Sequence, residues 1–263
     1  MFYVTNKDKI VSTIISLSTV LVLFLIATTI KQNDIGNAIQ TSASTSKMLP
    51  IYSVDTEENK VALTINCAWN AEDIDLILEV LAKNQVKATF FIVGDWASKF
   101  PDAVKKISDS GNEVANHSES HAHVNNLNYE KNVEQITKCS DRINKITGKP
   151  TTLYRGPYGE YNNTVIKAAE DNNHTMIQWN IDSLDYKGLT GEQMWERIEP
   201  KLTKGSIILM HNGTENTALS LDMIINNIKK KGYELVTVSD LIYKEEYTID
   251  NNGVQHEKFG ETS

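Results

Sequence analysis

Seven short apolar runs recur between residues 61 and 238, and amphipathic stretches separate them. In the first such stretch, residues 71–84, apolar side chains recur at i, i+3, i+4 and i+7, which predicts a helix. Short apolar runs alternating with helices are typical of a parallel sheet or a β/α barrel. The runs are 61–66, 87–93, 113–118, 152–155, 175–182, 206–211 and 233–238, and the further helical stretches are 97–110, 129–146, 161–172, 190–203 and 215–231.

A stretch without any charge lies near the N-terminus, from Ile10 to Ile30. Its length matches the ~20 residues that a helix needs to cross a bilayer. Lys7 and Lys9 precede it, which would keep the short N-terminus in the cytoplasm. A cleaved signal peptide is the alternative, but the stretch lacks a following A-x-A site and exceeds a usual signal core. We therefore expect a single-pass anchor in the cell membrane, with the rest of the chain on the extracytoplasmic side.

Polar segments flank the region of alternating runs. Residues 32–59 are rich in Ser and Thr and predict a stalk. Residues 243–263 lack periodicity and predict a loose polar tail. The expected organisation is an N-terminus and anchor over 1–31, the stalk, one domain over 60–242, and the tail.

The net charge of −8 argues against nucleic-acid binding, because a phosphate-binding surface needs clustered Lys and Arg. Cys67 and Cys139 are the two cysteines of the chain, and two cysteines cannot define a disulfide framework. Cys139 falls on the predicted helix 129–146, where a small buried side chain is the simplest interpretation. The sequence leaves the oligomeric state open.

Polar residues recur where the predicted strands end, although polar groups are costly in a core. The carboxyl ends of parallel strands are also where α/β proteins carry their active sites. His117 and His121 follow the third run, and two histidines at i and i+4 can bind one metal when the turn between them is helical. Neutral imidazole suits Zn²⁺, so we expect a divalent metal, with zinc first, although His123 could replace one of the pair. The other polar residues at strand ends are Arg155, Asp182, Asp185 and His211.

These residues resemble the motifs of the polysaccharide deacetylases of carbohydrate esterase family 4, which carry the NodB homology domain. The resemblance covers about residues 60–242 and implies a distorted (β/α)7 barrel, in agreement with the seven runs. The family's H-S/T-x-x-H appears at 117–121, its R-x-P-Y at 155–158, its D-x-x-D-W at 182–186 with Tyr186 in place of Trp, and its L-x-H at 209–211.

The first family motif, T-F-D-D-G-P, is altered and reads T-I-N-C-A-W over residues 64–69. In the family the first aspartate is the general base and the second is a metal ligand. Asn66 takes the place of the base, and an amide cannot accept a proton near neutral pH. Cys67 takes the place of the ligand, so the resemblance implies a metal set of Cys67, His117 and His121, since a thiolate binds zinc well. A small apolar filler is the alternative interpretation of Cys67.

The resemblance also assigns roles to the remaining motif residues. His211 would protonate the leaving amine, Asp185 would tune His211, and the backbone N–H of Tyr158 would stabilise the oxyanion. Arg155 pairs with the catalytic aspartate in the family, so here we expect it to pair with Asp182 or Asp185, or to face an anionic ligand. The carboxylates that could replace the lost base are Asp182, Asp185 and Glu119, and the expected substrate-binding residues are Tyr158, Pro157, Asp182 and Trp69.

The implied reaction is removal of N-acetyl groups from N-acetylglucosamine or N-acetylmuramic acid residues of a cell-envelope glycan. The expected anchor favours peptidoglycan over chitin, and a spore-envelope role follows from the resemblance alone. Loss of a general base typically lowers a rate by ~10²–10⁴-fold, so we expect a metal-dependent deacetylase of reduced activity. A catalytically silent glycan-binding module is the alternative, and an esterase acting on O-acetyl groups is a third interpretation.

Overall fold

The computed structural model describes residues 18, 21–22 and 47–258. The chain divides into two units, Met1–Lys47 and Met48–Ser263, and the second contains every strand of the described residues. The expected anchor over 10–30 falls outside the described residues except at 18, 21 and 22. No helix within the described part of the chain is long and apolar enough to cross a membrane.

Eight strands form one parallel sheet, which confirms the expected α/β architecture. β2 (Lys60–Cys67) is its central strand, and it pairs with β3, β8 and β9. The strand order is β6-β5-β4-β3-β2-β8-β7, with β9 beside the first residues of β2. Both faces of β2 are buried, as expected for a near-continuous apolar strand in a parallel sheet. The other strands are β3 (Thr89–Ile92), β4 (Glu113–Asn116), β5 (Leu153–Tyr154), β6 (Thr175–Met176), β7 (Ile181–Asp182), β8 (Ile207–His211) and β9 (Glu234–Val236).

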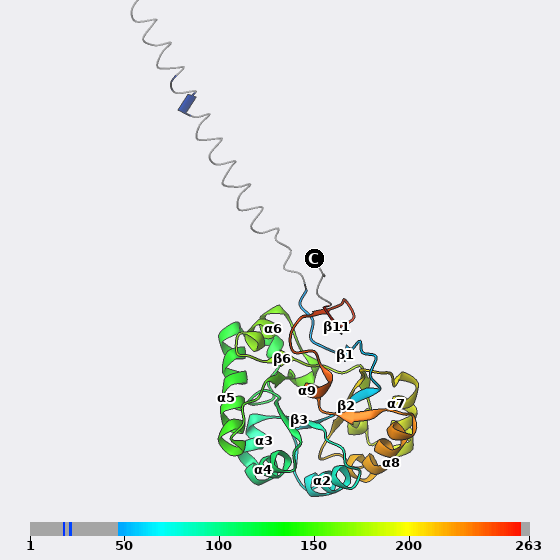
Figure 1. Ribbon diagram of the computed structural model, residues 1–263. Coiled ribbons are helices and arrows are strands. Elements are labelled where there is room, and N and C mark those ends of the chain that lie inside the picture. The colour runs from blue at the N-terminus through cyan, green and yellow to red at the C-terminus, as the bar shows by residue number, and fades with distance from the viewer. Residues whose placement is uncertain (1–17, 19–20, 23–46, 259–263) are drawn as a thin grey trace, which may run out of the picture. The chain divides into compact units, whose positions relative to one another are not determined.

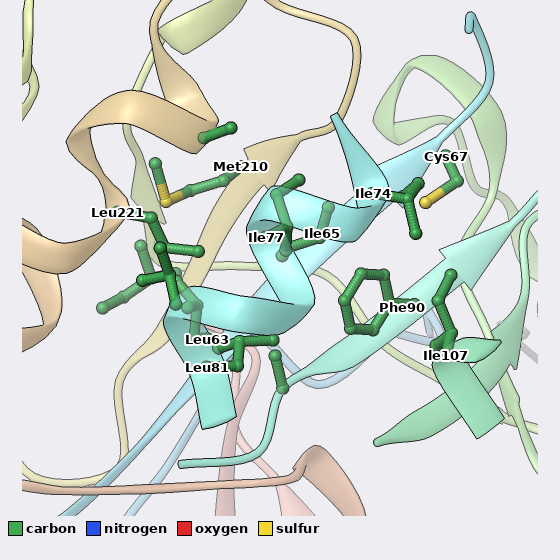
Figure 2. Packing of buried hydrophobic residues seen from close by; sticks show 14 of the residues in the cluster. Leu63, Ile65, Cys67, Ile74, Ile77, Leu81, Phe90, Ile107, Met210 and Leu221 are labelled. Atoms are coloured by element: carbon green, nitrogen blue, oxygen red, sulfur yellow. The ribbon is translucent and has the colours of Figure 1, made fainter. Parts of the chain in front are cut away.

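Helices surround this sheet on its outer side, as Figure 1 shows. Alternate residues of β2 point outward, and Leu63 and Ile65 pack with Ile77 and Phe90 in the larger apolar core (Figure 2). The intervening residue Thr64 points into the barrel, where its hydroxyl donates to a backbone carbonyl of β8. The helices are α2 (Ile74–Lys83), α3 (Gly94–Lys99), α4 (Pro101–Asp109), α5 (Tyr129–Thr147), α6 (Asn163–Glu170), α7 (Gly191–Ile198), α8 (Thr217–Lys230) and α9 (Val238–Leu241).

The run 175–182, which we expected to form one strand, is divided into β6 and β7. β6 pairs with β5 at one edge of the sheet, and β7 pairs with β8 at the other edge. Residues 177–180 therefore connect the two edges directly, which requires the sheet to curl into a barrel. The N-terminal segment packs against this connection, because the backbone N–H of Ile51 donates to Met176 and the N–H of Gln178 donates to Ile51.

Proline positions account for two differences from the expected helices. The predicted helix 97–110 is divided into α3 and α4, because Pro101 begins a new helix and removes a backbone donor. The predicted helix 190–203 ends as α7 at Ile198 and continues as a 3₁₀ turn, Glu199–Lys201, that contains Pro200. Helix α5 closely matches its prediction and ends on Gly148, which adopts the left-handed conformation at φ 72°.

The loose polar tail expected over 243–263 is wrong for residues 247–257. β10 (Tyr247–Ile249) and β11 (Val254–Glu257) form an antiparallel pair, and β1 (Ser53–Val54) joins β11 in parallel. β1 comes from the segment predicted to be a stalk, so folded structure begins well before Lys60. The pairing joins residues about 200 positions apart, and local periodicity carries no information about such a partner.

Gly205 packs closely against β1, because its carbonyl accepts a hydrogen bond from the N–H of Val54. This contact leads to a prediction about stability. Its φ is +74°, and a Cβ there would lie 1.7 Å from the carbonyl oxygen of Val54. We expect Gly205→Ala to lower the free energy of unfolding by ~1–2 kcal/mol for the left-handed conformation and by a further ~1–3 kcal/mol for the clash. Gly148→Ala is the matched control, because φ is +72° and nothing lies within 4 Å of the new Cβ. Equal losses in urea unfolding of the two variants would contradict the role given to Gly205.

Candidate active site

A cavity of about 430 Å³ opens at the carboxyl ends of the strands. Its volume lies in the range of small-molecule sites. It brings together residues from five of the predicted strand ends, as expected for the carboxyl ends of strands in a parallel barrel. The lining residues are Asn66, Ala68, Trp69, His117, His121, Tyr158, Gly159, Trp179, Asp182, Tyr186, Leu209 and His211.

Asn66 lines this cavity, and its side chain is hydrogen-bonded to the buried Arg155. The guanidinium Nη1 donates to the Asn66 side-chain oxygen at 2.9 Å. Arginine can only donate, so the amide oxygen must face it and the NH₂ group is turned away. An aspartate at this position would accept protons in the cavity, whereas Asn66 offers hydrogen-bond donors. Asn66 therefore occupies the position of the family's general base and keeps its hydrogen bond to Arg155, but it cannot accept a proton.

Arg155 is fully buried and has no carboxylate partner within the described part of the chain, so its expected pairing with Asp182 or Asp185 is wrong. Its guanidinium donates to the Thr64 hydroxyl at 2.9 Å and to the carbonyl of Gln178 at 2.9 Å, and it lies 3.8 Å from the ring centre of Phe91. Burial lowers the pKa of Arg155 well below its ordinary value, because desolvation penalises the charged form. Neutral dipoles and an aromatic face therefore replace the usual counter-ion.

Cys67 is not placed as a metal ligand, which corrects the expectation from the motif. It has no exposed surface and belongs to the apolar core beside Ile74, as Figure 2 shows. The side chain follows the period of two along β2, so it shares the outward face of Leu63 and Ile65. Burial raises the pKa of the Cys67 thiol well above its ordinary value, and the charge of Asp73 adds to this effect. The alternative interpretation, a small apolar filler, describes this placement.

His117 and His121 do lie together, with ring centres 5.1 Å apart. The carbonyl of Arg155 can only accept, so His117 Nδ1 carries a proton and donates to it at 2.7 Å, which leaves Nε2 unprotonated. Burial lowers the pKa of His117 well below its usual value, and the neighbouring His121 adds to this. Burial likewise lowers the pKa of His121. Both rings are therefore neutral imidazoles at neutral pH, the form that binds metals.

The two histidines fit a divalent metal, but the third ligand does not. No group of three or more His, Cys, Asp or Glu is positioned to hold an ion anywhere in the described ranges. Cys67 faces the core, and Glu119 is bound to Arg142 on α5 instead of facing the cavity. The side chains present therefore do not assemble the zinc site that the motifs implied.

His211 and Asp185 form a hydrogen-bonded pair at the site. The Asp185 carboxylate accepts from His211 Nδ1 at 2.8 Å and from the His211 backbone N–H at 2.6 Å. The hydroxyl of Thr217 and the N–H of Tyr186 also donate to this carboxylate. The imidazole is thereby held in one orientation, with Nε2 left for the cavity. This is the arrangement expected for a proton donor whose orientation a carboxylate maintains.

Aromatic rings surround the mouth of the cavity. Trp69, Tyr158 and Tyr186 are 49%, 60% and 46% exposed, and they are the exposed large aromatic side chains of the described residues. Trp69 stacks on His211 with ring centres 5.4 Å apart, and Tyr186 meets the same imidazole edge-on at 5.3 Å. Tyr158 lies against His121 and stacks on His123. Exposed aromatic faces gathered at one opening indicate a ligand-binding surface.

Backbone conformation also marks this region. Seven non-glycine residues of the described ranges have positive φ, and four of them lie in the loops of the site, where such strained conformations cluster in functional proteins. The four are Ser118, His121, Tyr158 and Leu184.

Two residues differ from the sequence expectation for substrate binding. Pro157 is buried and does not line the cavity, so it supports the Tyr158 turn instead of contacting a ligand. Trp179 lines the cavity although we did not predict it. It lies in the connection 177–180, which the sequence suggested was strand, and only the division of that run exposes it to the site.

Comparisons with known proteins show the family of this chain. The sequence profile of the polysaccharide deacetylase family matches residues 53–177. A peptidoglycan-N-acetylglucosamine deacetylase of Bacillus cereus is 33% identical over 194 residues, which are 72% of this chain and 70% of that protein. The uncharacterized protein YlxY of Bacillus subtilis is 35% identical over 193 residues, 73% of this chain and 60% of that protein. The chain thus spans less than two thirds of YlxY.

A solved structure with a similar fold belongs to a CE4 family pseudoenzyme from Bacillus anthracis. It superposes with a TM-score of 0.72 at 32% identity and covers 79% of this chain and 73% of that chain. A mutant of that pseudoenzyme with restored enzymatic activity superposes with a TM-score of 0.71 at 34% identity, over 73% of this chain and 70% of that one.

The unpaired charge of Arg155 predicts that Asn66→Asp stabilises the protein. A carboxylate at this position would accept a charge-assisted hydrogen bond, so we expect the free energy of unfolding to rise by ~1.5–3 kcal/mol at pH 7. The guanidinium should depress the pKa of the new carboxyl in the folded state. The gain is then fully present above the unfolded pKa of about 3.9 and is lost as the pH falls through the lower folded pKa.

Asn116→Asp is the control for this measurement by urea unfolding. Asn116 is buried at the end of β4, and its NH₂ group donates to the Ile136 carbonyl and to the Ser140 hydroxyl. An aspartate there loses both donors, so we expect destabilisation of ~1–3 kcal/mol. A loss of stability in Asn66→Asp comparable to that of the control would show that Arg155 needs no counter-ion.

Proposed function

Because the chain belongs to the polysaccharide deacetylase family, we propose that it acts on an N-acetylated cell-wall glycan as an N-deacetylase of strongly reduced turnover. The observation that carries the proposal is an active site with an ordered acid and a neutral residue at the base position. His211 is held by Asp185, whereas Asn66 is held by Arg155. The exposed rings at the cavity mouth provide the surface for a sugar chain.

The proposed reaction is hydrolysis of the acetamide bond. Water adds to the acetyl carbonyl carbon, the carbon–nitrogen bond breaks, and acetate and a free amine leave. His211 Nε2 lines the cavity and can deliver the proton that the leaving amine requires. Asn66 cannot remove the proton from the attacking water, so that proton must pass to solvent, and the loss of a positioned base corresponds to ~3–5.5 kcal/mol of transition-state stabilisation.

A glycan-binding module without turnover is the second candidate. The burial of Cys67 in the core favours it, because the described residues then lack the third side chain of a metal set. The similarity to a family pseudoenzyme supports the same candidate. Both candidates share the cavity and the aromatic surface, so they differ in chemistry and not in ligand class.

The rate of acetate release from N-acetylglucosamine oligomers and from N-acetylated peptidoglycan separates the two candidates. We expect slow release by the wild-type protein and loss of that release in His211→Ala. Asn66→Asp should raise the rate at least about tenfold, since base catalysis typically contributes ~10²–10⁴-fold. Arg155 is already placed to receive the new carboxylate.

Cys67→Asp and the double variant Asn66→Asp/Cys67→Asp complete this series. Cys67→Asp alone restores no base, so we expect little change in rate and some loss of stability, because a carboxylate would enter the apolar core. Acetate release in the double variant alone, with glycan binding by the wild-type protein, would assign this chain to the binding-module candidate. Absence of both release and binding would reject the proposed function.

A further proposal concerns location. The uncharged segment 10–30 and the lysines before it support a membrane anchor that holds the domain on the extracytoplasmic side. We expect the protein isolated from cell membranes to retain its original N-terminus. Mature protein that begins near residue 31, as determined by N-terminal sequencing, would instead indicate a cleaved signal peptide.

A further inference from the structure

A second cavity of about 360 Å³ adjoins the site, and Trp69 and Tyr186 line both cavities. The two rings therefore stand between neighbouring compartments. A chain-like ligand that enters the site cavity can continue past these rings into the second one. The other lining residues of the second cavity are Asp185, Gly188, Gly213, Thr214 and Glu215.

The charged residues that line the two cavities are all acidic. No Lys or Arg lines either of them, whereas Asp182, Asp185 and Glu215 do. Arg155 is fully buried and lines neither cavity. An ammonium group is therefore favoured over a carboxylate in these compartments.

Glu215 is the carboxylate that remains available for such a group. Asp185 is occupied by His211 and Thr217, and Asp182 accepts from the backbone N–H of Leu184. Glu215 is exposed, lies against Gly188, and has no hydrogen-bond or ion-pair partner among the residues at 47–258. The faces of Trp69 and Tyr186 can add a cation–π attraction to this carboxylate.

We propose that the second cavity binds the ammonium group of a de-N-acetylated amino sugar that neighbours the sugar in the site cavity. This inference rests on the proposed function and specifies its ligand as a partly deacetylated glycan. Such a glycan is the product of an active N-deacetylase, because removal of an acetyl group leaves an amine that carries a proton below its pKa. The protein then acts after that reaction, on chains that already contain free amines.

The test compares two tetrasaccharides of β-linked glucosamine, one fully N-acetylated and one with a single N-acetyl group. Isothermal titration calorimetry with the full-length protein at pH 6 and low salt gives both affinities. We expect the wild-type protein to bind the partly deacetylated tetrasaccharide about fivefold more tightly, from one exposed charge pair and one cation–π contact. Added salt should reduce this preference.

Glu215→Gln should bring the two affinities to the same value by weakening only the binding of the partly deacetylated tetrasaccharide. Glu192→Gln is the matched control, because Glu192 is exposed on α7 and lines neither cavity, and it should keep the preference. Trp69→Ala should weaken both tetrasaccharides. Equal affinities in the wild-type protein, or a preference that survives Glu215→Gln, would overturn the inference while leaving the proposed function intact. Failure of both tetrasaccharides to bind would overturn the two together.

Discussion

A buried guanidinium that can only donate hydrogen bonds organises the active-site end of this barrel. Arg155 needs acceptors on every side, and it finds them in the Thr64 hydroxyl, the Asn66 amide and the carbonyl of Gln178. The Thr64 hydroxyl in turn donates to the carbonyl of Ile208. One side chain thus connects β5, the central strand β2, strand β8 and the segment that closes the barrel. A buried cation without a counter-ion is tolerated because each of its three nitrogens has an acceptor, with the carbonyl of Ile177 serving Nε.

The same requirement explains how the chemistry could change while the architecture persisted. Asparagine has the shape of aspartate and still presents an oxygen to Arg155, so the replacement preserves the hydrogen bond and removes the charge. Cysteine is small and apolar enough to join the core of Leu63 and Ile65. Neither residue of the altered motif disturbs packing. His211 lies beside Asn66 on the neighbouring strand β8, and its imidazole is held by Asp185 and by neither altered residue.

The strands β2, β3 and β8 were predictable because they are buried on both faces and therefore read as apolar runs. The polar residues at the strand ends were predictable as a group, because polar side chains directly after an apolar run mark the place where a buried strand leaves the core. The outward orientation of Cys67 follows from the alternation of side chains along β2. We nevertheless predicted a metal ligand, because Cys67 takes the place of a ligand in the family motif. The Thr64 hydroxyl and the Gln178 carbonyl could not be predicted as partners of Arg155, because they lie 91 and 23 positions away and one is a backbone oxygen. β10 and β11 were missed because their stability depends on a distant strand.

The strand order has a consequence for how the chain folds during synthesis. Strands β2 to β6 are contiguous in the sheet and can pair as they emerge, but the second edge of β2 waits for residues 207–211. Until then the central strand presents a row of unpaired backbone groups, the kind of edge that invites association with other chains. The nascent domain is thus most vulnerable to aggregation over the interval between the synthesis of Met176 and His211. A chaperone that shields this strand edge would protect the protein at that stage.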